Sequence, residues 1–308
     1  MCEELVKDLD FNRDSEYPKL DNWTILIPSK NRLDKEITYK LLAKQGILDR
    51  VPTYLVVEPQ EYEEAQKKGF RCISLDKNDQ GMLYCRNWMI RYAQENNLEH
   101  VCILDDDLKN IGIIDPDPDK PGKYKRYVSD SNGNKRCYLE FLLKTAERLD
   151  GMACIPYAPF ADHFYETKLK KEPSGIDICG YFYQVLLYNM KYMPKNFQIR
   201  DDGTIDDAEQ LIQLTLENKV KIYKIYKYYF SSVPCGSNTG GMNSLKLHDK
   251  YDIWLENAKK LYGDLVRLDD STIYKFRIDS RLLSKRMKKQ FSEMDSKVTE
   301  LDTINIIL

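Results

Sequence analysis

The sequence has no long hydrophobic run and no excess of charge of one sign. No stretch approaches the roughly 18 apolar residues of a membrane span, and the first residues, MCEELVKDLDFNRD, lack the apolar core of a signal peptide. The 308 residues include 47 Lys and Arg against 49 Asp and Glu, which gives a net charge of −2. We therefore expect a cytoplasmic protein without a membrane span, in which only a local basic surface could attract nucleic acid.

The sequence also lacks closely spaced cysteines. None of its eight cysteines forms a CxxC pair, and several lie within apolar runs. This pattern predicts buried, reduced thiols rather than a disulfide framework. Structural zinc is not expected, because no Cys and His residues cluster at ligand spacing.

What is present is an alternation of two kinds of segment over the first 110 residues. Short apolar runs typical of buried strands cover residues 23–29, 53–59, 70–76 and 100–107. Helical spacing covers residues 33–47, 59–68 and 81–97. This order predicts an α/β fold with a mainly parallel sheet flanked by helices. In such sheets ligands bind beyond the carboxyl ends of the strands, where the polar residues Ser29, Glu58, Asp76 and 105–107 follow the apolar runs.

The pattern loosens after Leu108. Residues 115–136 read as a polar insertion with a hairpin turn at Asn132-Gly133. Beyond the insertion, the spacing predicts helices at 138–150 and 206–219, strands at 151–159, 175–190 and 220–230, and a charged helical pattern from about 249. We expect one domain with two halves, followed by a helical C-terminal extension at 249–308. Residues 1–110 would form the nucleotide-sugar-binding half, and residues 111–248 the acceptor-binding half, with strands in mixed directions.

Three consecutive aspartates end the fourth apolar run. Alternation along a strand places Asp105 and Asp107 on one side and Asp106 on the other. Two carboxylates beyond a parallel strand suit a hard divalent cation, Mn²⁺ or Mg²⁺, which is commonly shared with substrate phosphates. A solvated strand end, or a cap of the following segment, would explain the same residues without a metal.

Four segments together resemble the GT-A type of nucleotide-sugar glycosyltransferase: TILIPSKNR (24–32), VVEPQEY (56–62), GMLYCRNWMI (81–90) and CILDDDL (102–108). The resemblance implies a GT-A fold and a DxD motif that holds a divalent metal at Asp105 and Asp107. It also implies contacts to the nucleotide sugar from residues of all four segments. These are Pro28, Ser29, Arg32, Glu58, Gly81, Arg86, Asn87, Asp105 and Asp106.

The amino-acid sequences of these segments resemble those of one subgroup, the TET-associated glycosyltransferases of bacteriophages. This resemblance implies transfer of a hexose or pentose from a UDP-sugar to the hydroxymethyl group of 5-hydroxymethylcytosine-type bases in double-stranded DNA. If the chain is encoded by a phage, the expected location is the host cell cytoplasm. The identity of the sugar, the stereochemical course and the oligomeric state stay open.

A second acid pair lies about 100 residues beyond the first. By the same resemblance, an inverting enzyme would use Asp206 or Asp207, at the start of the helix predicted at 206–219, as its general base. Capping and interaction with the helix dipole explain the same residues without catalysis. Asp201-Asp202 is a rival pair, and a retaining enzyme would need neither pair as base.

Histidine is the candidate for a third metal ligand from the second half. His248 follows the glycine-rich loop 235–244 and is favoured over His163, whereas His100 opens its strand at the end remote from the aspartates. A structural role for each histidine remains open.

Basic segments are the candidates for contact with DNA. Lys or Arg gather at 119–127 and 285–290, and Tyr and Lys alternate at 223–230. Ordinary solvated faces would look the same. Three other functions remain: a GT-A transferase acting on a glycan, lipid or protein hydroxyl, a nucleotidyltransferase, and a binding module. The nucleotidyltransferase is disfavoured because IPSKNRLDK contains no glycine.

Overall fold

The computed structural model describes residues 11–158, 175–178, 184–201, 206–233, 251–269, 276–279 and 281–292. The chain divides into two compact units. The first comprises Met1–Asp177, Tyr183–Gln198 and Tyr223–Leu245, and the second comprises Ile178–Phe182, Ile199–Ile222 and Lys246–Leu308.

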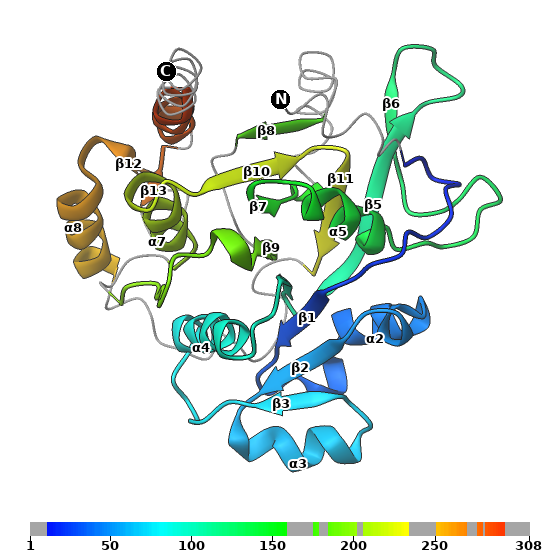
Figure 1. The fold of residues 1–308 in the computed structure, drawn as a ribbon, viewed down its shortest axis with the longest axis horizontal. Coiled ribbons are helices and arrows are strands. Elements are labelled where there is room, and N and C mark those ends of the chain that lie inside the picture. The colour runs from blue at the N-terminus through cyan, green and yellow to red at the C-terminus, as the bar shows by residue number, and fades with distance from the viewer. Residues whose placement is uncertain are drawn as a thin grey trace, which may run out of the picture. The chain divides into compact units, whose positions relative to one another are not determined.

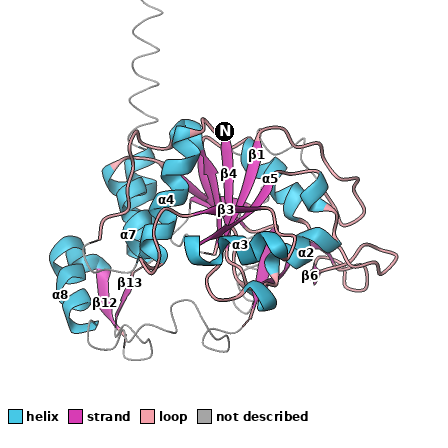
Figure 2. Cartoon of the chain, turned by 90° about the horizontal axis from the view of Figure 1, so that it is seen from below, coloured by secondary structure: helices cyan, strands magenta, loops and turns pink. Residues whose placement is uncertain are grey.

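A parallel set of four strands forms the beginning of the first unit. These are β1 (Trp23–Pro28), β2 (Thr53–Val57), β3 (Cys72–Ser74) and β4 (His100–Leu104), in the spatial order β3-β2-β1-β4. Every residue of β1 is buried, as expected for a strand covered on both faces. The connecting helices are α2 (Thr38–Lys44), α3 (Pro59–Lys67) and α4 (Met82–Glu95). Figure 2 shows α4 on one side of these strands and α2 on the other.

The sheet continues as a mixed sheet beyond β4. Strand β9 (Val185–Asn189) runs antiparallel to β4, and β7 (Gly151–Cys154) runs antiparallel to β9. The order β3-β2-β1-β4-β9-β7-β10-β8 is completed by β10 (Lys221–Ile225) and β8 (Ile176–Ile178). Helix α5 (Leu139–Glu147) is buried along most of its length and contacts β9. The predicted α/β class, with a mainly parallel first half and a mixed second half, is confirmed.

The helix predicted at 33–47 is interrupted, so that part of the prediction is wrong. A short 3-10 turn, η1 (Leu33–Lys35), is followed by Glu36 in an extended conformation, and α2 begins only at Thr38. The amides of Ile37 and Thr38 donate to the carbonyl of Asp106, at 3.1 and 3.2 Å, instead of to the preceding turn. The break therefore serves a contact with the chain beyond β4. After α2, Gly46 adopts a φ of 67° and leads into η2 (Ile47–Asp49).

A second sheet of three strands was not expected from the polar segment after Leu108. It has the order β11-β5-β6 and contains β5 (Leu108–Pro116), β6 (Tyr124–Tyr127) and β11 (Tyr228–Ser232). The strand predicted at 220–230 is therefore two strands, β10 and β11, in different sheets. The predicted turn at Asn132-Gly133 is present: Gly133 has a φ of 81°, and Ser129 bridges Lys135 across the turn.

The second unit contains α7 (Asp206–Ile212), which continues as a π-helical turn, η5 (Gln213–Glu217). Farther along the chain lie α8 (Tyr251–Tyr262), the turn η8 (Gly263–Leu265), the strand pair β12 (Val266–Leu268) and β13 (Phe276–Ile278), and a helix at 281–292. In the first unit, β9 is followed by the turn η4 (Met190–Tyr192). Among the described residues, no helix is both long and apolar enough to cross a membrane.

Candidate active site at the carboxyl ends of the parallel strands

The parallel pairing of β1 with both β2 and β4 brings the ends of these strands together. Pro28 aligns with Val56 of β2, and Leu26 aligns with Ile103 of β4. Residues that follow the three strands therefore gather at one edge of the sheet. This edge is where ligands bind in open α/β sheets, and it contains most of the predicted site residues.

The three aspartates after β4 differ in environment. Asp106 is buried, and its Oδ1 lies 2.5 Å from Nη1 of Arg32, whereas Asp105 and Asp107 are half-buried. Burial raises the pKa of the Asp106 carboxyl, and the Arg32 guanidinium opposes that rise. The Arg32–Asp106 ion pair thus joins two predicted site residues within the chain. Asp105 and Asp107 are both more exposed than Asp106. All three aspartates lie beyond the end of β4 at Leu104, so the predicted alternation along a strand does not apply to them.

The backbone of the aspartate turn is held by the start of α2. The Thr38 hydroxyl donates to the carbonyl of Asp105 at 2.5 Å and accepts from the amide of Leu108 at 2.9 Å. The Asp106 carbonyl accepts from two amides at the same helix start. Thr38 is fully buried. Sequence patterns gave no signal for this role, because the partners lie about 70 positions apart along the chain.

Glu58, which follows β2, accepts hydrogen bonds from other residues of the chain. Its Oε1 accepts from Lys30 Nζ at 2.8 Å and from the Asp79 amide at 2.9 Å, and its Oε2 accepts from Gln60 at 2.8 Å. Burial lowers the pKa of Lys30, but its hydrogen bonds with Asp79 and Glu58 outweigh this effect and raise it. Glu58 therefore fixes Lys30 and the loop before α4 at the edge of the predicted nucleotide site.

The end of β1 is also fixed by buried contacts. Pro28 is the last residue of β1, and the amide of the buried Ser29 donates to the Val56 carbonyl at 2.9 Å. Asn31 has a φ of 55°, and its amide donates to Glu61 Oε1 at 2.8 Å. Burial raises the pKa of the Glu61 carboxyl. The segment that carries Ser29, Lys30 and Arg32 is thus held in one conformation by β2 and α3.

Helix α4 supplies three further predicted residues. Gly81 precedes the helix with φ 83° and ψ 177°, a conformation that favours glycine. Arg86 is buried within the helix and Asn87 is half-buried. Burial raises the pKa of the neighbouring Cys85 thiol to about 12, while Arg86 lowers it and Glu58 raises it. The Asp79 amide, two residues before Gly81, donates to Glu58, so the start of α4 lies near Glu58.

The two half-buried carboxylates fit a shared divalent cation. Mg²⁺ and Mn²⁺ prefer oxygen ligands and are often bound by one or two carboxylates together with substrate phosphates and water. Within the described residues, no group of three or more His, Cys, Asp or Glu side chains is arranged to hold a metal ion. The predicted third ligand, His248, lies outside the described residues. If a cation binds here, Asp105 and Asp107 would supply only part of its coordination shell.

The second acid pair belongs to the second unit. Asp206 begins α7, and Asp207 lies half-buried in its first turn. Glu209 of the same helix is fully buried, and its Oε1 accepts from Nε of Arg200 at 2.7 Å. The same guanidinium lies 2.5 Å from Glu217. Arg200 thereby anchors the chain just before Asp201, which is exposed, whereas Asp202 lies outside the described residues.

A wide cleft of about 1310 Å³ lies at the other end of β4. His100, Glu147, Asn189 and Lys191 are among the residues that line it, and none of the predicted site residues does. A large concave pocket is the usual first candidate for a ligand site. Here the carboxylates, the cations and the strand ends lie elsewhere, so we assign the candidate site by side-chain chemistry and topology.

The chain resembles known proteins in the sequence of one family and, distantly, in solved structures. No curated protein matches the chain. Among solved structures, a mannosyltransferase from Pyrobaculum calidifontis, in complex with GDP-Man and Mn²⁺, is 13% identical, with a TM-score of 0.45. The match covers 77% of this chain and 64% of the mannosyltransferase, so the chain spans less than two thirds of that protein. A glucosyl-3-phosphoglycerate synthase from Mycobacterium tuberculosis, in complex with Mn²⁺, UDP-glucose and phosphoglyceric acid, is 10% identical over 90% of both chains, with a TM-score of 0.42.

A family model matches residues 23–238, more than half of the chain, and is described as TET-Associated Glycosyltransferase. The matched region contains β1 to β4, the aspartate turn, the second sheet and α7. The resemblance noted in the sequence is therefore confirmed. The chain belongs to the TET-associated glycosyltransferase family and is a glycosyltransferase.

Proposed function

We propose that this protein transfers a sugar from a UDP-sugar to the hydroxymethyl group of a 5-hydroxymethylcytosine-type base in double-stranded DNA. The observation that carries the proposal is the aspartate turn after β4, where Asp105 and Asp107 are half-buried while Asp106 is paired with Arg32 at 2.5 Å. Family membership supports sugar transfer. The reaction would run in the cytoplasm, of a host cell if a phage encodes the chain, and the free thiols of all five described cysteines suit that compartment.

The donor would lie against residues 1–110. Asp105 and Asp107 would hold Mn²⁺ or Mg²⁺, which when bound neutralises the negative charge of the diphosphate leaving group. Lys30 and Arg32 carry positive charge at the same edge of the sheet. The two cations are held by Glu58 and Asp106, so their positions are fixed before a donor binds. Fixed charge that needs no rearrangement is the most effective kind for stabilising a transition state.

The nucleotide would contact the remaining residues of this edge. Pro28, Ser29 and Gly81 offer backbone and small side chains, which permit close approach of a ligand. Arg86 and Asn87 of α4 would contribute polar groups from the neighbouring helix. Glu58 would act through Lys30 and the loop at Asp79, because its two carboxylate oxygens already accept three hydrogen bonds from the chain.

The acceptor would lie against residues 111–248. In an inverting reaction, the hydroxyl oxygen of the base forms a bond to the anomeric carbon while the bond from that carbon to the diphosphate oxygen breaks. The bonding electrons leave with the nucleoside diphosphate, and the hydroxyl proton passes to a carboxylate. Asp207 or Asp206 is the proposed base, and His248 is the proposed third metal ligand. A retaining reaction would need a different base.

Transfer assays with matched acceptors test the proposal. The protein is incubated with Mn²⁺, a UDP-sugar and duplexes that differ only in carrying cytosine or 5-hydroxymethylcytosine, and the DNA mass is measured. We expect a mass gain of one sugar on the hydroxymethylated duplex alone. Transfer to a glycan, lipid or protein hydroxyl, with no gain on either duplex, would replace the DNA acceptor while retaining a glycosyltransferase.

The donor sugar is found by thermal unfolding. A ligand that binds only the folded state raises the melting temperature, so a panel of UDP-sugars is compared with and without Mn²⁺. We expect one sugar to give the largest rise, and expect that rise to require the metal. Equal rises with and without Mn²⁺ would contradict the proposed role of Asp105 and Asp107.

A further inference from the structure

The second sheet continues directly from the aspartate turn. We call residues 108–127 the arm: β5, the turn at 117–123 and β6 (Figure 1). Leu108, the first residue of β5, follows Asp107. Over the eight steps of β5, a rise of 3.3–3.4 Å per residue separates Leu108 from Pro116 by about 27 Å. The arm thus connects the proposed metal-binding turn with a surface well away from it.

Close packing fixes the arm against β11. The ring of Tyr229 crosses β5 at Gly112, where a Cβ atom would lie only 2.3 Å from the ring. Any other residue at that position would force the Tyr229 ring to move. The Tyr229 hydroxyl donates to the Tyr127 carbonyl at 3.3 Å, and Arg126 donates to the Ala158 carbonyl at 2.9 Å. Both contacts tie β6 to the body of the first unit.

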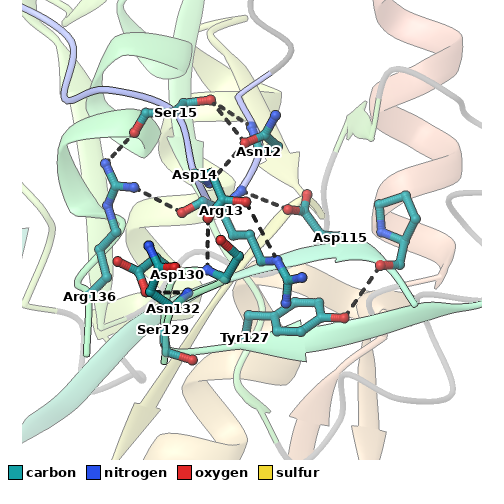
Figure 3. A network of polar contacts seen from close by, with 12 residues as sticks. Asn12, Arg13, Asp14, Ser15, Asp115, Tyr127, Ser129, Asp130, Asn132 and Arg136 are labelled. Carbon is teal, nitrogen blue, oxygen red and sulfur yellow. Dashed lines mark hydrogen bonds and ion pairs between the residues drawn. The ribbon is translucent and has the colours of Figure 1, made fainter. Parts of the chain in front are cut away.

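A strap from the N-terminal segment holds the other side of the arm. We define the strap as residues 11–17 (Figure 3). The Arg13 amide donates to Asp115 of β5 at 2.7 Å, and the Arg13 guanidinium lies over the ring of Tyr127, 4.5 Å from its centroid. The buried Arg136 donates to the carbonyls of Arg13 and Ser15, and its guanidinium lies 4.3 Å from the ring centroid of Tyr17. Residues about 100 positions apart in sequence thus stiffen the arm at the end of β5 that is next to the turn.

The tip of the arm is ordered and exposed. Its turn is closed by a hydrogen bond from the Asp117 amide to the Lys123 carbonyl, at 2.8 Å, and by another from Lys123 to the Lys120 carbonyl, at 3.0 Å. The exposed residues of the tip and of β6 include three lysines and a tyrosine: Lys120, Lys123, Lys125 and Tyr124. With Arg126, this stretch carries four cations against the two acids Asp117 and Asp119. A stiff arm therefore presents net positive charge and an exposed ring in a chain that is slightly acidic overall.

We propose that the arm lies along the sugar–phosphate backbone of the DNA acceptor, with Lys120, Lys123 and Lys125 against phosphates. This inference rests on the proposed function. Base pairs rise by 3.4 Å each, so an arm that reaches about 27 Å from the aspartate turn contacts the duplex about eight base pairs from the modified base. Charge complementarity favours DNA over a neutral glycan or lipid. Because the arm is stiff, its length determines which phosphates the three lysines reach.

The test combines a triple variant with two lengths of duplex. Lys120→Ala/Lys123→Ala/Lys125→Ala is compared with wild type on hydroxymethylated duplexes of about 24 and about 6 base pairs, the shorter of which cannot reach the arm. On the long duplex we expect kcat/KM to fall about tenfold or more, and the slope of log affinity against log salt to decrease by about 2.7, at 0.9 per phosphate contact. On the short duplex we expect a change of less than about twofold, because no phosphate contact is lost there.

A matched control removes the same charge elsewhere in the first unit. Lys44, Lys67 and Lys191 are also exposed, and their triple alanine variant is expected to behave as wild type on both duplexes. The charge-reversed variant Lys120→Glu/Lys123→Glu/Lys125→Glu should lose more activity on the long duplex than the alanine variant. Melting temperatures show that each variant is folded.

The outcomes separate the arm from the acceptor itself. Wild-type protein that modifies neither duplex but modifies another polymer overturns the proposed function, and with it this inference. Wild-type protein that modifies DNA, while the arm variant keeps full activity and an unchanged salt slope on the long duplex, overturns the arm alone. An equal loss in the control variant would also overturn it, because the effect would then follow net charge rather than position.

Discussion

The two ends of β4 differ in how their charged and polar side chains are paired. At its carboxyl end, Asp106 pairs with Arg32 and the turn backbone is hydrogen-bonded by Thr38. At its amino end, His100 stacks on Trp23 at 4.9 Å between ring centroids. Neither ring nitrogen of His100, nor the indole nitrogen of Trp23, has a hydrogen-bond partner in the part of the chain that the structure describes. The wide cleft lies at the amino end. The size of the cleft would therefore place a ligand site at the amino end of β4, whereas the paired charges would place it at the carboxyl end.

The difference shows which feature identifies a site for charged ligands. Fixing charges in advance costs free energy, since each buried group must be paired or hydrogen-bonded. Such an arrangement is expected where a diphosphate and a cation must be held, and of the two ends of β4 the carboxyl end has it. An open cleft lined by both polar and apolar residues does not require buried charges to be paired, so it carries no comparable cost in free energy. The predictions below test this contrast between the two ends.

The largest effect is expected from Asp107→Asn at the carboxyl end. Loss of one metal-binding carboxylate removes several kcal/mol of charge stabilisation, which at 1.36 kcal/mol per tenfold corresponds to a fall in kcat of about 1000-fold. The matched change at the amino end, Glu147→Gln, is expected to alter kcat by less than about twofold, as surface substitutions away from a site usually do. Initial rates at saturating donor and acceptor measure both. Equal losses in the two variants would abolish the contrast.

Glu36 provides the next largest effect, on stability rather than activity. Burial raises the pKa of its carboxyl to about 7, although the amides of Tyr39 and Lys40 donate to it. In the unfolded chain the Glu36 carboxyl ionises near its ordinary pKa of 4.5. Stability that is fully present below pH 4.5 is therefore lost as the pH rises to about 7. The loss is on the order of 3 kcal/mol, at 1.36 kcal/mol per pH unit.

Denaturant unfolding of wild type and of Glu36→Gln at several pH values tests whether stability falls as the pH rises. Because the amide does not ionise, we expect the variant to gain stability relative to wild type between pH 4.5 and 7 and the difference to stay constant above that range. A difference that does not change with pH would show that Glu36 is not the group responsible.

Thr38→Val removes the hydroxyl that bridges the aspartate turn while keeping the shape of the side chain. The Asp105 carbonyl and the Leu108 amide each lose a buried hydrogen bond. Outer contacts that orient metal ligands typically contribute 10–100-fold, and we expect a loss of about that size in kcat/KM, with a higher Mn²⁺ concentration needed for half-maximal rate. Thr38→Ser keeps the hydroxyl and should recover most of the wild-type kcat/KM and most of the wild-type Mn²⁺ requirement. A loss of stability without any change in the Mn²⁺ requirement would limit Thr38 to a structural role.

The sequence predicted the parts of this site that depend on local pattern. Apolar runs placed β1 to β4 close to their observed positions, because buried parallel strands are continuously hydrophobic. The role of Thr38 and the break before α2 could not be predicted, because both depend on contacts with residues near 106, far along the chain. Strand β5 was missed because its polar outer part, together with the turn that follows, reads as a loop.

Glu58 illustrates a further limit of pattern. An acid after the second strand predicted a ligand contact, yet in the structure its oxygens hold Lys30 and Asp79. Sequence shows that a charged residue lies at a strand end, but not which of its neighbours neutralises it. The three-dimensional pairing decides whether an acid meets the ligand or positions a cation that does.

The smallest effect is expected from His100→Phe at the amino end. Burial lowers the pKa of His100, against the opposing influence of Glu147 and Glu99, so the folded protein holds the neutral ring. Stability from this group is present above pH 6.5, the ordinary pKa of histidine, and is lost as the pH falls through the lowered pKa of His100. Phenylalanine keeps the stack on Trp23 and has no nitrogen in need of a partner. We expect the variant to unfold at a higher temperature than wild type at pH 5.5, with a smaller gain at pH 8, and to transfer sugar within about twofold of the wild-type rate. A loss of transfer as large as that of Thr38→Val would place the amino end within the catalytic apparatus, and polar organisation would then no longer distinguish the two ends of β4.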